Sequence, residues 1–293
     1  MLAETIKKYN HIYSVVALFI VAGIWGSGFP IIKIALDSGV LPNAMVGIRF
    51  IVAFFLMFIF LKMRGTIIKK EEVKIGLGVG VLLFLAFSTQ TIGAVHTSAS
   101  KSAFITGANV VMVPFVYWIL SKEKPRIIVY FTSLLCFIGI GVLSLERDIS
   151  LNYGDTLTLI GSIFFAVHMV VIGLSLKNYN PLTVNCFQML SAGVLGIICN
   201  LFFEPKSLFE TSFNTSQIIA LGIIILFNTF LCYLIQTSVQ KFVLPSRVAL
   251  ILSTEMVFGA VFSVLIMGDL VTLKLVLGGI IIFTSIIIAE IRN

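Results

Sequence analysis

The sequence predicts an all-α integral membrane protein with about ten transmembrane helices. Hydrophobic residues occupy 59% of the 293 positions, charged residues occupy only 11%, and the mean hydropathy is +1.11. Water-soluble domains do not have such a composition. A helix needs about 20 apolar residues to cross a bilayer, so the chain has room for about ten spans and short connections. We expect no separate soluble domain.

The predicted helices lie between clusters of charged, Gly, Pro or Asn residues that interrupt the apolar segments. Several segments begin at or just after a proline, which is favoured in the first turn of a helix. The first segment is longer than a signal-peptide core and lacks a small-residue cleavage site, so we expect a retained helix. The expected helices are residues 13–36, 43–62, 74–95, 100–120, 126–145, 154–175, 181–202, 216–239, 245–267 and 272–290.

The distribution of Lys and Arg predicts the orientation, since the cytoplasmic loops of membrane proteins hold the excess of these residues. If the N-terminus is cytoplasmic, the outer connections carry only Lys101, Arg147, Lys206 and Lys274. We therefore expect both termini in the cytoplasm and the chain in the cytoplasmic (inner) membrane. The same loops account for the net charge of +7 without a nucleic-acid partner.

The two halves of the chain resemble each other when they are aligned with an offset of 146 residues. This offset pairs Gln90 with Gln236 and Lys101 with Arg247. Each half, 1–150 and 151–293, holds five predicted helices, and an odd number makes the second half enter the membrane from the opposite side. The sequence thus predicts two inverted five-helix repeats around a central cavity, an arrangement that favours alternating access.

Three stretches carry a resemblance to a known family: WGSGFPIIKIAL (25–36), TSASKSAFITGANVVMVPF (97–115) and PSRVALILSTEMVFGAVFSVLIMGD (245–269). They resemble the drug/metabolite transporter superfamily, specifically the EamA-type ten-helix permeases. The resemblance implies that helices 1, 3, 4, 6, 8 and 9 surround a cavity, that helices 5 and 10 are peripheral, and that amino acids or other metabolites are exported. Family members commonly have Glu-Pro in helix 9, whereas here Met256 follows Glu255, so we expect a weaker kink.

Glu255 is the strongest candidate for a functional residue because it falls near the middle of predicted helix 9. A charged carboxylate at that depth costs roughly 2.5–3.5 kcal/mol on insertion scales, so intramembrane carboxylates are functional by default. Glu255 could bind a cationic part of a substrate or a coupling proton. The alternative is a protonated Glu that joins helices through hydrogen bonds.

The repeat places Asn109 of predicted helix 4 at the position equivalent to Glu255. Ser102, Thr106 and Asn109 share one face of that helix, since they follow i, i+4, i+7 spacing. Such a polar stripe inside an apolar helix is expected to face the bundle interior. It could bind substrate, or it could make hydrogen bonds between helices.

The remaining candidates lie on other predicted helices. His168, near the centre of helix 6, could relay protons or bind substrate, although lone buried histidines are often packing residues. The repeat aligns Phe87 and Gln90 on helix 3 with Tyr233 and Gln236 on helix 8, an aromatic residue followed one turn later by an amide. Such a pair could stack on and hydrogen-bond a polar ligand, or it could serve packing alone. Trp25 precedes a Gly- and Pro-containing stretch of helix 1 that predicts either a kinked gate or close helix packing.

Lys33 and Arg49 fall nearer the predicted outer surface than the candidates above. Long basic side chains near helix ends commonly extend to the membrane interface. We therefore expect both to be interfacial rather than part of a binding site.

No nucleotide-binding, zinc-protease, serine-hydrolase or dinucleotide motif stands in the sequence. We expect no enzyme activity, no cofactor and no metal. The expected function is secondary transport that exports an amino acid by alternating access, with protons as candidate coupling ions. The expected assembly is a monomer or a homodimer. Alternatives are transport of cationic drugs or other metabolites, a passive channel, and a lipid-modifying enzyme. The residues expected at the substrate or coupling site are Glu255, Asn109, His168, Gln236, Tyr233, Gln90, Trp25 and Thr106.

Overall fold

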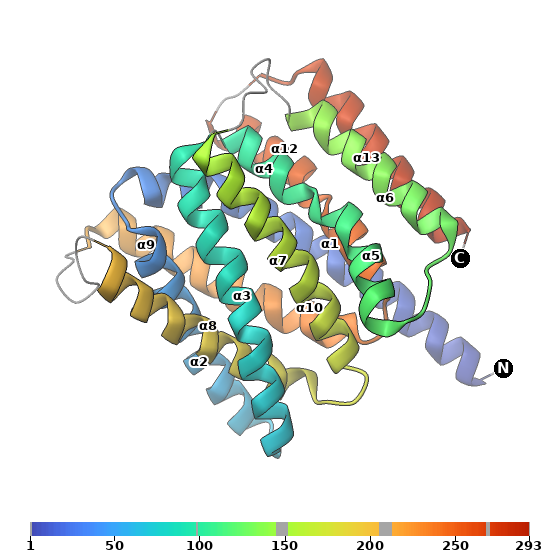
Figure 1. Ribbon diagram of the computed structural model, residues 1–293, viewed down its shortest axis with the longest axis horizontal. Helices are drawn as coiled ribbons and strands as arrows, with labels where there is room; N and C mark the ends of the chain where they lie inside the picture. Colours follow the sequence, from blue (N-terminus) through green and yellow to red (C-terminus); the bar gives the residue numbers. More distant parts are fainter. Residues whose placement is uncertain (1, 98, 145–151, 205–212, 268–269, 293) are drawn as a thin grey trace.

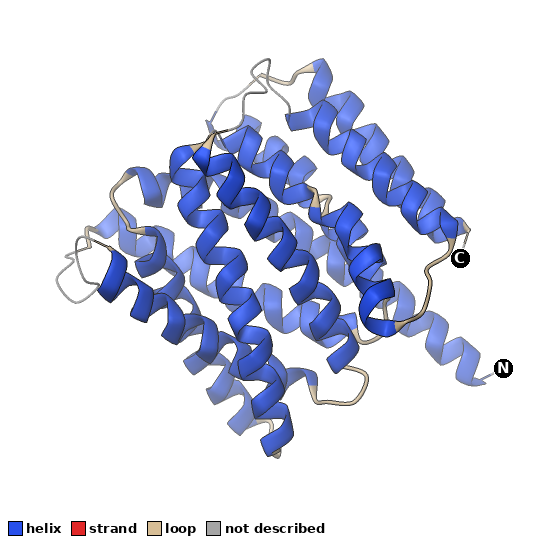
Figure 2. Cartoon of the chain, viewed as in Figure 1, coloured by secondary structure: helices blue, strands red, loops and turns tan. Residues whose placement is uncertain are grey.

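The computed structural model describes residues 2–97, 99–144, 152–204, 213–267 and 270–292. Within them, 10 helical segments are long and apolar enough to cross a membrane, which confirms the predicted all-α membrane fold. Figure 2 shows helices joined by short connections over the described chain. The expected boundary between the halves, at residues 150 and 151, lies outside the described ranges, as do Arg147 and Lys206.

The spans, numbered 1 to 10 in chain order, consist of one helix each or of consecutive shorter helices. Spans 1, 2 and 3 are α1 (Leu2–Asp37), α2 (Pro42–Met63) and α3 (Lys70–His96). Span 4 combines α4 (Ala99–Gly107) and α5 (Asn109–Ser121), and span 5 is α6 (Ile127–Ser144). Spans 6 and 7 are α7 (Tyr153–Ser175) and α8 (Pro181–Phe203). Span 8 combines α9 (Thr215–Ile223), the π-helix η2 (Ile224–Leu231) and α10 (Cys232–Gln240); span 9 combines α11 (Pro245–Leu252) and α12 (Glu255–Met267); span 10 is α13 (Leu273–Ile291).

Span 9 is broken where the sequence predicts one continuous helix over 245–267. The hydroxyl groups of Ser253 and Thr254 donate to the carbonyl oxygens of Ala249 (2.8 Å) and Ile251 (2.7 Å). Hydroxyl groups that bond to the preceding turn in this way compete with the helical backbone pattern. The Thr254 N–H bonds to the Ile251 carbonyl three residues back, which tightens the turn. The helix therefore breaks at this point although Met256, and not a proline, follows Glu255.

Spans 4 and 8 also depart from the predicted continuous helices over 100–120 and 216–239. In span 4 the α-helical pattern stops at Gly107, and the Ala108 N–H bonds to Ile105 only three residues back. Glycine is a poor helix former, which weakens the helix at this point. In span 8 the π-helix η2 replaces the α-helical backbone pattern over residues 224–231, and the Thr229 side-chain hydroxyl also donates to the Ile224 carbonyl at 2.9 Å.

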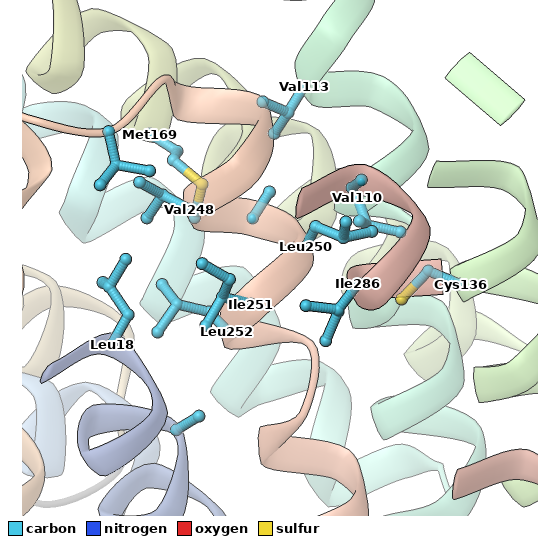
Figure 3. Close-up of a cluster of buried hydrophobic side chains, with 14 of the residues drawn as sticks. Leu18, Val110, Val113, Cys136, Met169, Val248, Leu250, Ile251, Leu252 and Ile286 are labelled. Carbon is cyan, nitrogen blue, oxygen red and sulfur yellow. The ribbon is translucent and has the colours of Figure 1, made fainter. Parts of the chain in front are cut away.

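The spans pack in pairs that join distant parts of the sequence. α3 lies along α7, α2 lies along α8, and α6 lies along α13. Figure 1 shows the α6–α13 pair at one edge of the molecule, with α1, α5 and α12 between that pair and the rest of the bundle. Figure 3 shows part of the apolar core, where Leu18 of α1, Met169 of α7 and Ile251 of α11 lie near one another.

Two glutamates hold the starts of α2 and α8. The Glu204 carboxylate, just after α8, accepts from the backbone N–H groups of Asn43 (2.6 Å) and Ala44 (3.1 Å) in the first turn of α2. The Glu72 carboxylate, in the first turn of α3, accepts from the N–H of Asn180 (3.2 Å), which caps α8. Both carboxylates satisfy N–H groups that a helix N-terminus leaves unpaired. Each contact joins the first half of the chain to the second.

Candidate functional site

A cavity of about 110 Å³ lies inside the bundle, between spans 1, 2, 3, 4, 6, 8 and 9. The sequence-predicted residues all contribute to its wall, so the structure brings together side chains from both halves of the chain. Peripheral spans 5 and 10 contribute none of the described lining residues. The wall consists of Trp25, Phe29, Ile32, Arg49, Phe87, Gln90, Thr106, Gly107, Asn109, Phe165, His168, Met169, Asn228, Tyr233, Gln236, Ala249, Leu252, Ser253, Glu255 and Met256.

The breaks in spans 4 and 9 place Asn109 and Glu255 in the cavity wall. Asn109 is the first residue of α5, and Glu255 is the first residue of α12. Both side chains are half-buried, and neither makes a hydrogen bond or an ion pair within the described part of the chain. Discontinuous membrane helices commonly present ligand-binding groups at such interior ends. The two side chains are therefore available to a ligand.

The side chains of Thr106 and Gln90 are hydrogen-bonded to each other. The Gln90 side-chain amide donates to the Thr106 hydroxyl at 3.0 Å, and the Ser162 hydroxyl of α7 donates to the Thr106 carbonyl at 3.1 Å. These bonds join spans 3, 4 and 6 beside the cavity. For this pair, the structure thus contains the interhelical hydrogen bonding that the sequence left as one of two alternatives.

His168 lines the cavity and belongs to a chain of hydrogen bonds behind it. Its Nε2 lies 2.9 Å from Oε1 of Gln188, whose amide group donates to Asn185 Oδ1 at 2.8 Å. Because Gln188 presents its oxygen to the imidazole, this arrangement places the proton of a neutral His168 on Nε2. Gln188 and Asn185 are both fully buried. The histidine ring is thereby held in one orientation at the cavity wall.

Trp25 and Asn228 hold spans 1 and 8 together. The Trp25 indole Nε1 donates to the Asn228 carbonyl at 2.7 Å, and the Asn228 side-chain amide donates to the Ile24 carbonyl at 2.6 Å. α1 continues through the Gly- and Pro-containing stretch. A Cβ atom on Gly26 would lie 2.7 Å from the Glu255 carbonyl oxygen, so this glycine allows α1 to approach α12. Close packing accounts for Gly26.

An aromatic cluster forms another part of the wall. The Tyr233 ring packs edge-on against Trp25 at 5.5 Å and Phe87 at 6.4 Å between centroids, and Phe87 packs against Phe165 at 5.0 Å. On the same helix as Tyr233, Gln236 donates to Gln240 at 3.3 Å. The surface of the wall is thus largely aromatic and apolar, with polar groups from several spans set into it, as in small-molecule sites generally.

The prediction that the Arg49 side chain extends to the membrane interface is wrong. The side chain is 3% exposed, lines the cavity, and donates from Nε to the Thr229 hydroxyl of η2 at 3.0 Å. Its guanidinium lies over the rings of Phe87 (4.6 Å) and Phe50 (5.2 Å). Lys33, by contrast, is exposed and pairs with Asp37 at 2.6 Å, as an interfacial residue would.

The sequence pattern could not identify Arg49, because every face of a membrane helix is apolar. α2 has apolar residues towards lipid and towards the bundle alike, so its periodicity does not reveal which side Arg49 occupies. Asn228 and Ser253 are also lining residues that the sequence analysis missed. Asn228 and its neighbour Thr229 interrupt an otherwise apolar stretch, and this polar pair was the available signal.

Comparisons with known proteins agree with this architecture. The model of the EamA-like transporter family matches residues 12–145 and 152–290. An uncharacterized transporter of Archaeoglobus fulgidus is 33% identical over 99% of this chain and 89% of its own length. The uncharacterized inner membrane transporter YedA of Escherichia coli K12 is 28% identical over 73% of this chain and 69% of its own length.

A solved crystal structure superposes with a TM-score of 0.80 over 96% of this chain and 98% of that one, at 13% identity, and it establishes the fold alone. The two family matches together cover most of the sequence, and they fall on the spans that build the cavity. The chain therefore belongs to the EamA-like transporter family, a family of transporters rather than enzymes.

Proposed function

We propose that this protein is a secondary transporter that exports a small metabolite, most specifically an amino acid, by alternating access. The observation that carries the proposal is the half-buried Glu255 carboxylate, which faces the interior cavity without a partner among the described side chains. A carboxylate that only joined helices would be expected to bond to a neighbouring span. An available one can bind an ammonium group or a proton.

The inverted repeat remains part of the proposal, and two pairs of features support it. The breaks at Ala108 and at Ser253–Thr254 are related by the sequence offset of 146 residues. The Glu204 and Glu72 contacts act at opposite ends of the α2–α8 pair, because one holds the start of α2 and the other the start of α8. Two such halves, 1–150 and 151–293, could exchange roles when access changes sides.

The proposed orientation has both termini in the cytoplasm and the protein in the inner membrane, on the basis of the Lys and Arg distribution. Export of an amino acid is the direction that the family resemblance implies. Protons are the proposed coupling ions, because Glu255 offers a protonatable group inside the membrane. We propose a monomeric or homodimeric assembly.

Transport of a cationic compound is the second candidate, and one observation favours it. Glu255 shares the cavity with the rings of Trp25, Phe87, Phe165 and Tyr233, and aromatic faces attract cations. A passive channel is a third reading. It differs from a carrier because its flux does not saturate and shows no counterflow.

Counterflow in proteoliposomes tests the proposal. Proteoliposomes that contain the purified protein are loaded with unlabelled neutral, basic or acidic amino acids, or with organic cations. The uptake of labelled tracer is then followed. Liposomes without protein provide the background. Saturable counterflow for one amino-acid class is the expected result. Counterflow for cations alone would favour the second candidate, and flux without saturation or counterflow would contradict a carrier.

A further inference from the structure

Arg49 is a buried cation without an anionic partner in the described structure. Its Nε bonds to the neutral Thr229 hydroxyl, and its planar face lies over Phe87 and Phe50. Neither Nη nitrogen makes a hydrogen bond to a described residue. A buried charge that is not paired costs several kcal/mol, and one neutral hydrogen bond with two ring contacts offsets this cost only in part. Arg49 is therefore poised to bind an anion.

The surroundings of Arg49 fix its geometry. The Thr229 hydroxyl donates to the Ile224 carbonyl within the π-helix, so its lone pairs face the guanidinium. The Phe87 ring is held in turn by Phe165 and Tyr233. A guanidinium that is fixed on one edge and one face keeps its Nη edge as a fork, which matches a carboxylate with two parallel hydrogen bonds. π-helical turns inside α-helices occur frequently at functional sites.

Two other residues of the cavity wall carry buried acceptor oxygens that lack donors. The Gln240 amide donates to the Met169 carbonyl, so Gln240 presents its oxygen to the Gln236 amide nitrogen. This leaves Gln236 Oε1 buried without a partner. Asn228 is oriented in the same way by its bond to the Ile24 carbonyl, which leaves Oδ1 unpartnered. Both oxygens are enclosed by protein atoms, whereas the half-buried Glu255 carboxylate lines the cavity and is the acceptor that a ligand can reach.

We propose that Arg49 binds the carboxylate of the transported substrate, while the Glu255 carboxylate, which lines the same cavity, binds its ammonium group. The inference rests on the proposed transport function and narrows its substrate class to small zwitterions, amino acids above all. In a cavity that binds simple organic cations, an unpaired Arg49 would repel the ligand and weaken its binding. The role of Arg49 is recognition, because it would contact the substrate directly.

The test uses matched ligands that differ only in their charged groups. Three sets are suitable: alanine, propionate and ethylamine; leucine, 4-methylpentanoate and 3-methylbutylamine; phenylalanine, 3-phenylpropionate and 2-phenylethylamine. Binding is measured by competition against a labelled amino acid, and directly by calorimetry, with the full-length protein in nanodiscs. The variants are Arg49→Lys, Arg49→Gln and Glu255→Gln, with Arg126→Gln as a control because Arg126 is exposed.

The wild type should bind the amino acid of one set tighter than the matching amine. Arg49→Gln should weaken amino-acid and acid binding by roughly 10- to 100-fold, the range for losing charge-assisted hydrogen bonds. The matching amine should bind Arg49→Gln as well as the wild type, or better. Arg49→Lys should be intermediate, because lysine keeps the charge but not the fork. Arg126→Gln should change nothing.

An unchanged ratio of amino-acid to amine affinity in folded Arg49→Gln or Arg49→Lys would overturn the inference, as would a wild type that binds no carboxylate in any set. The proposed function fails separately. If acids bind in an Arg49-dependent way while amino acids show no counterflow, the carboxylate site stands and amino-acid transport does not. If amino acids are exchanged equally well by Arg49→Gln, the transporter stands and the carboxylate site does not.

Discussion

Spans 4 and 9 share a geometry but differ in the chemistry that they bring to the cavity. Each breaks inside the membrane, and each begins its second helix with a polar residue in the cavity wall. In span 4 that residue is the amide Asn109, and in span 9 it is the carboxylate Glu255. Because span 4 forms its break with a neutral side chain, the geometry does not require a charge. The carboxylate of span 9 is therefore best explained by what the cavity binds.

Replacing Glu255 with Gln should have the largest effect. This change keeps the size and the break but removes the negative charge, so exchange should fall by about 100-fold or more if a charged or protonatable group is essential, since one charge-assisted contact alone accounts for a large part of this range. Counterflow measures the loss, and thermal unfolding with size-exclusion chromatography measures folding.

Glu71→Gln is the matched control, because Glu71 is an exposed carboxylate on α3. Exchange at the wild-type rate in Glu255→Gln would remove the difference between the two spans, and with it the proposed role of Glu255.

Gly26→Val should come next, through the packing that holds span 9 in place. A Cβ at Gly26 would lie 2.7 Å from the Glu255 carbonyl oxygen and from the Gly259 nitrogen. α1 and α12 would have to separate, at a cost of about 1–3 kcal/mol for overpacking. We expect a lower unfolding temperature and reduced exchange.

Gly23→Val is the control for this change, because Gly23 lies on the same helix and a Cβ there would meet nothing within 4 Å. Equal loss of stability in the two variants would show that valine in α1, rather than contact with span 9, causes the effect.

Asn109→Ala should reduce exchange less than Glu255→Gln. The Asn109 amide is neutral, and a single hydrogen bond contributes about 1 kcal/mol, or roughly fivefold in affinity. The measurement is the concentration of substrate that gives half-maximal counterflow. Complete loss of exchange in a folded Asn109→Ala protein would mean that the two breaks contribute equally, contrary to the difference in their chemistry.

The sequence predicted the fold and the candidate residues of the wall better than it predicted their local geometry. Hydropathy and the clusters of charged, Gly, Pro and Asn residues between apolar segments located the spans, because bilayer thickness sets the length of a span. Mid-membrane polar residues such as His168 and Glu255 are costly away from an interior site, so their depth alone made them candidates, and both line the cavity. The break at Ser253–Thr254 depends on side-chain to backbone bonds, and the burial of Arg49 depends on how α2 is rotated against its neighbours. Sequence composition predicts neither the break in span 9 nor the burial of Arg49.

The smallest expected effect comes from Trp25→Phe, which leaves both breaks intact. Phenylalanine keeps a ring against Tyr233 but loses the indole donor, so the Asn228 carbonyl loses its 2.7 Å bond and span 1 loses one tie to span 8. We expect a loss of about 1 kcal/mol in stability and a change in exchange of only a few fold. Trp118→Phe is the control, because that ring is 42% exposed on α5. If Trp25→Phe instead abolished exchange as Glu255→Gln should, the indole would contact the substrate itself, and span 1 would join the spans that supply polar groups to the site.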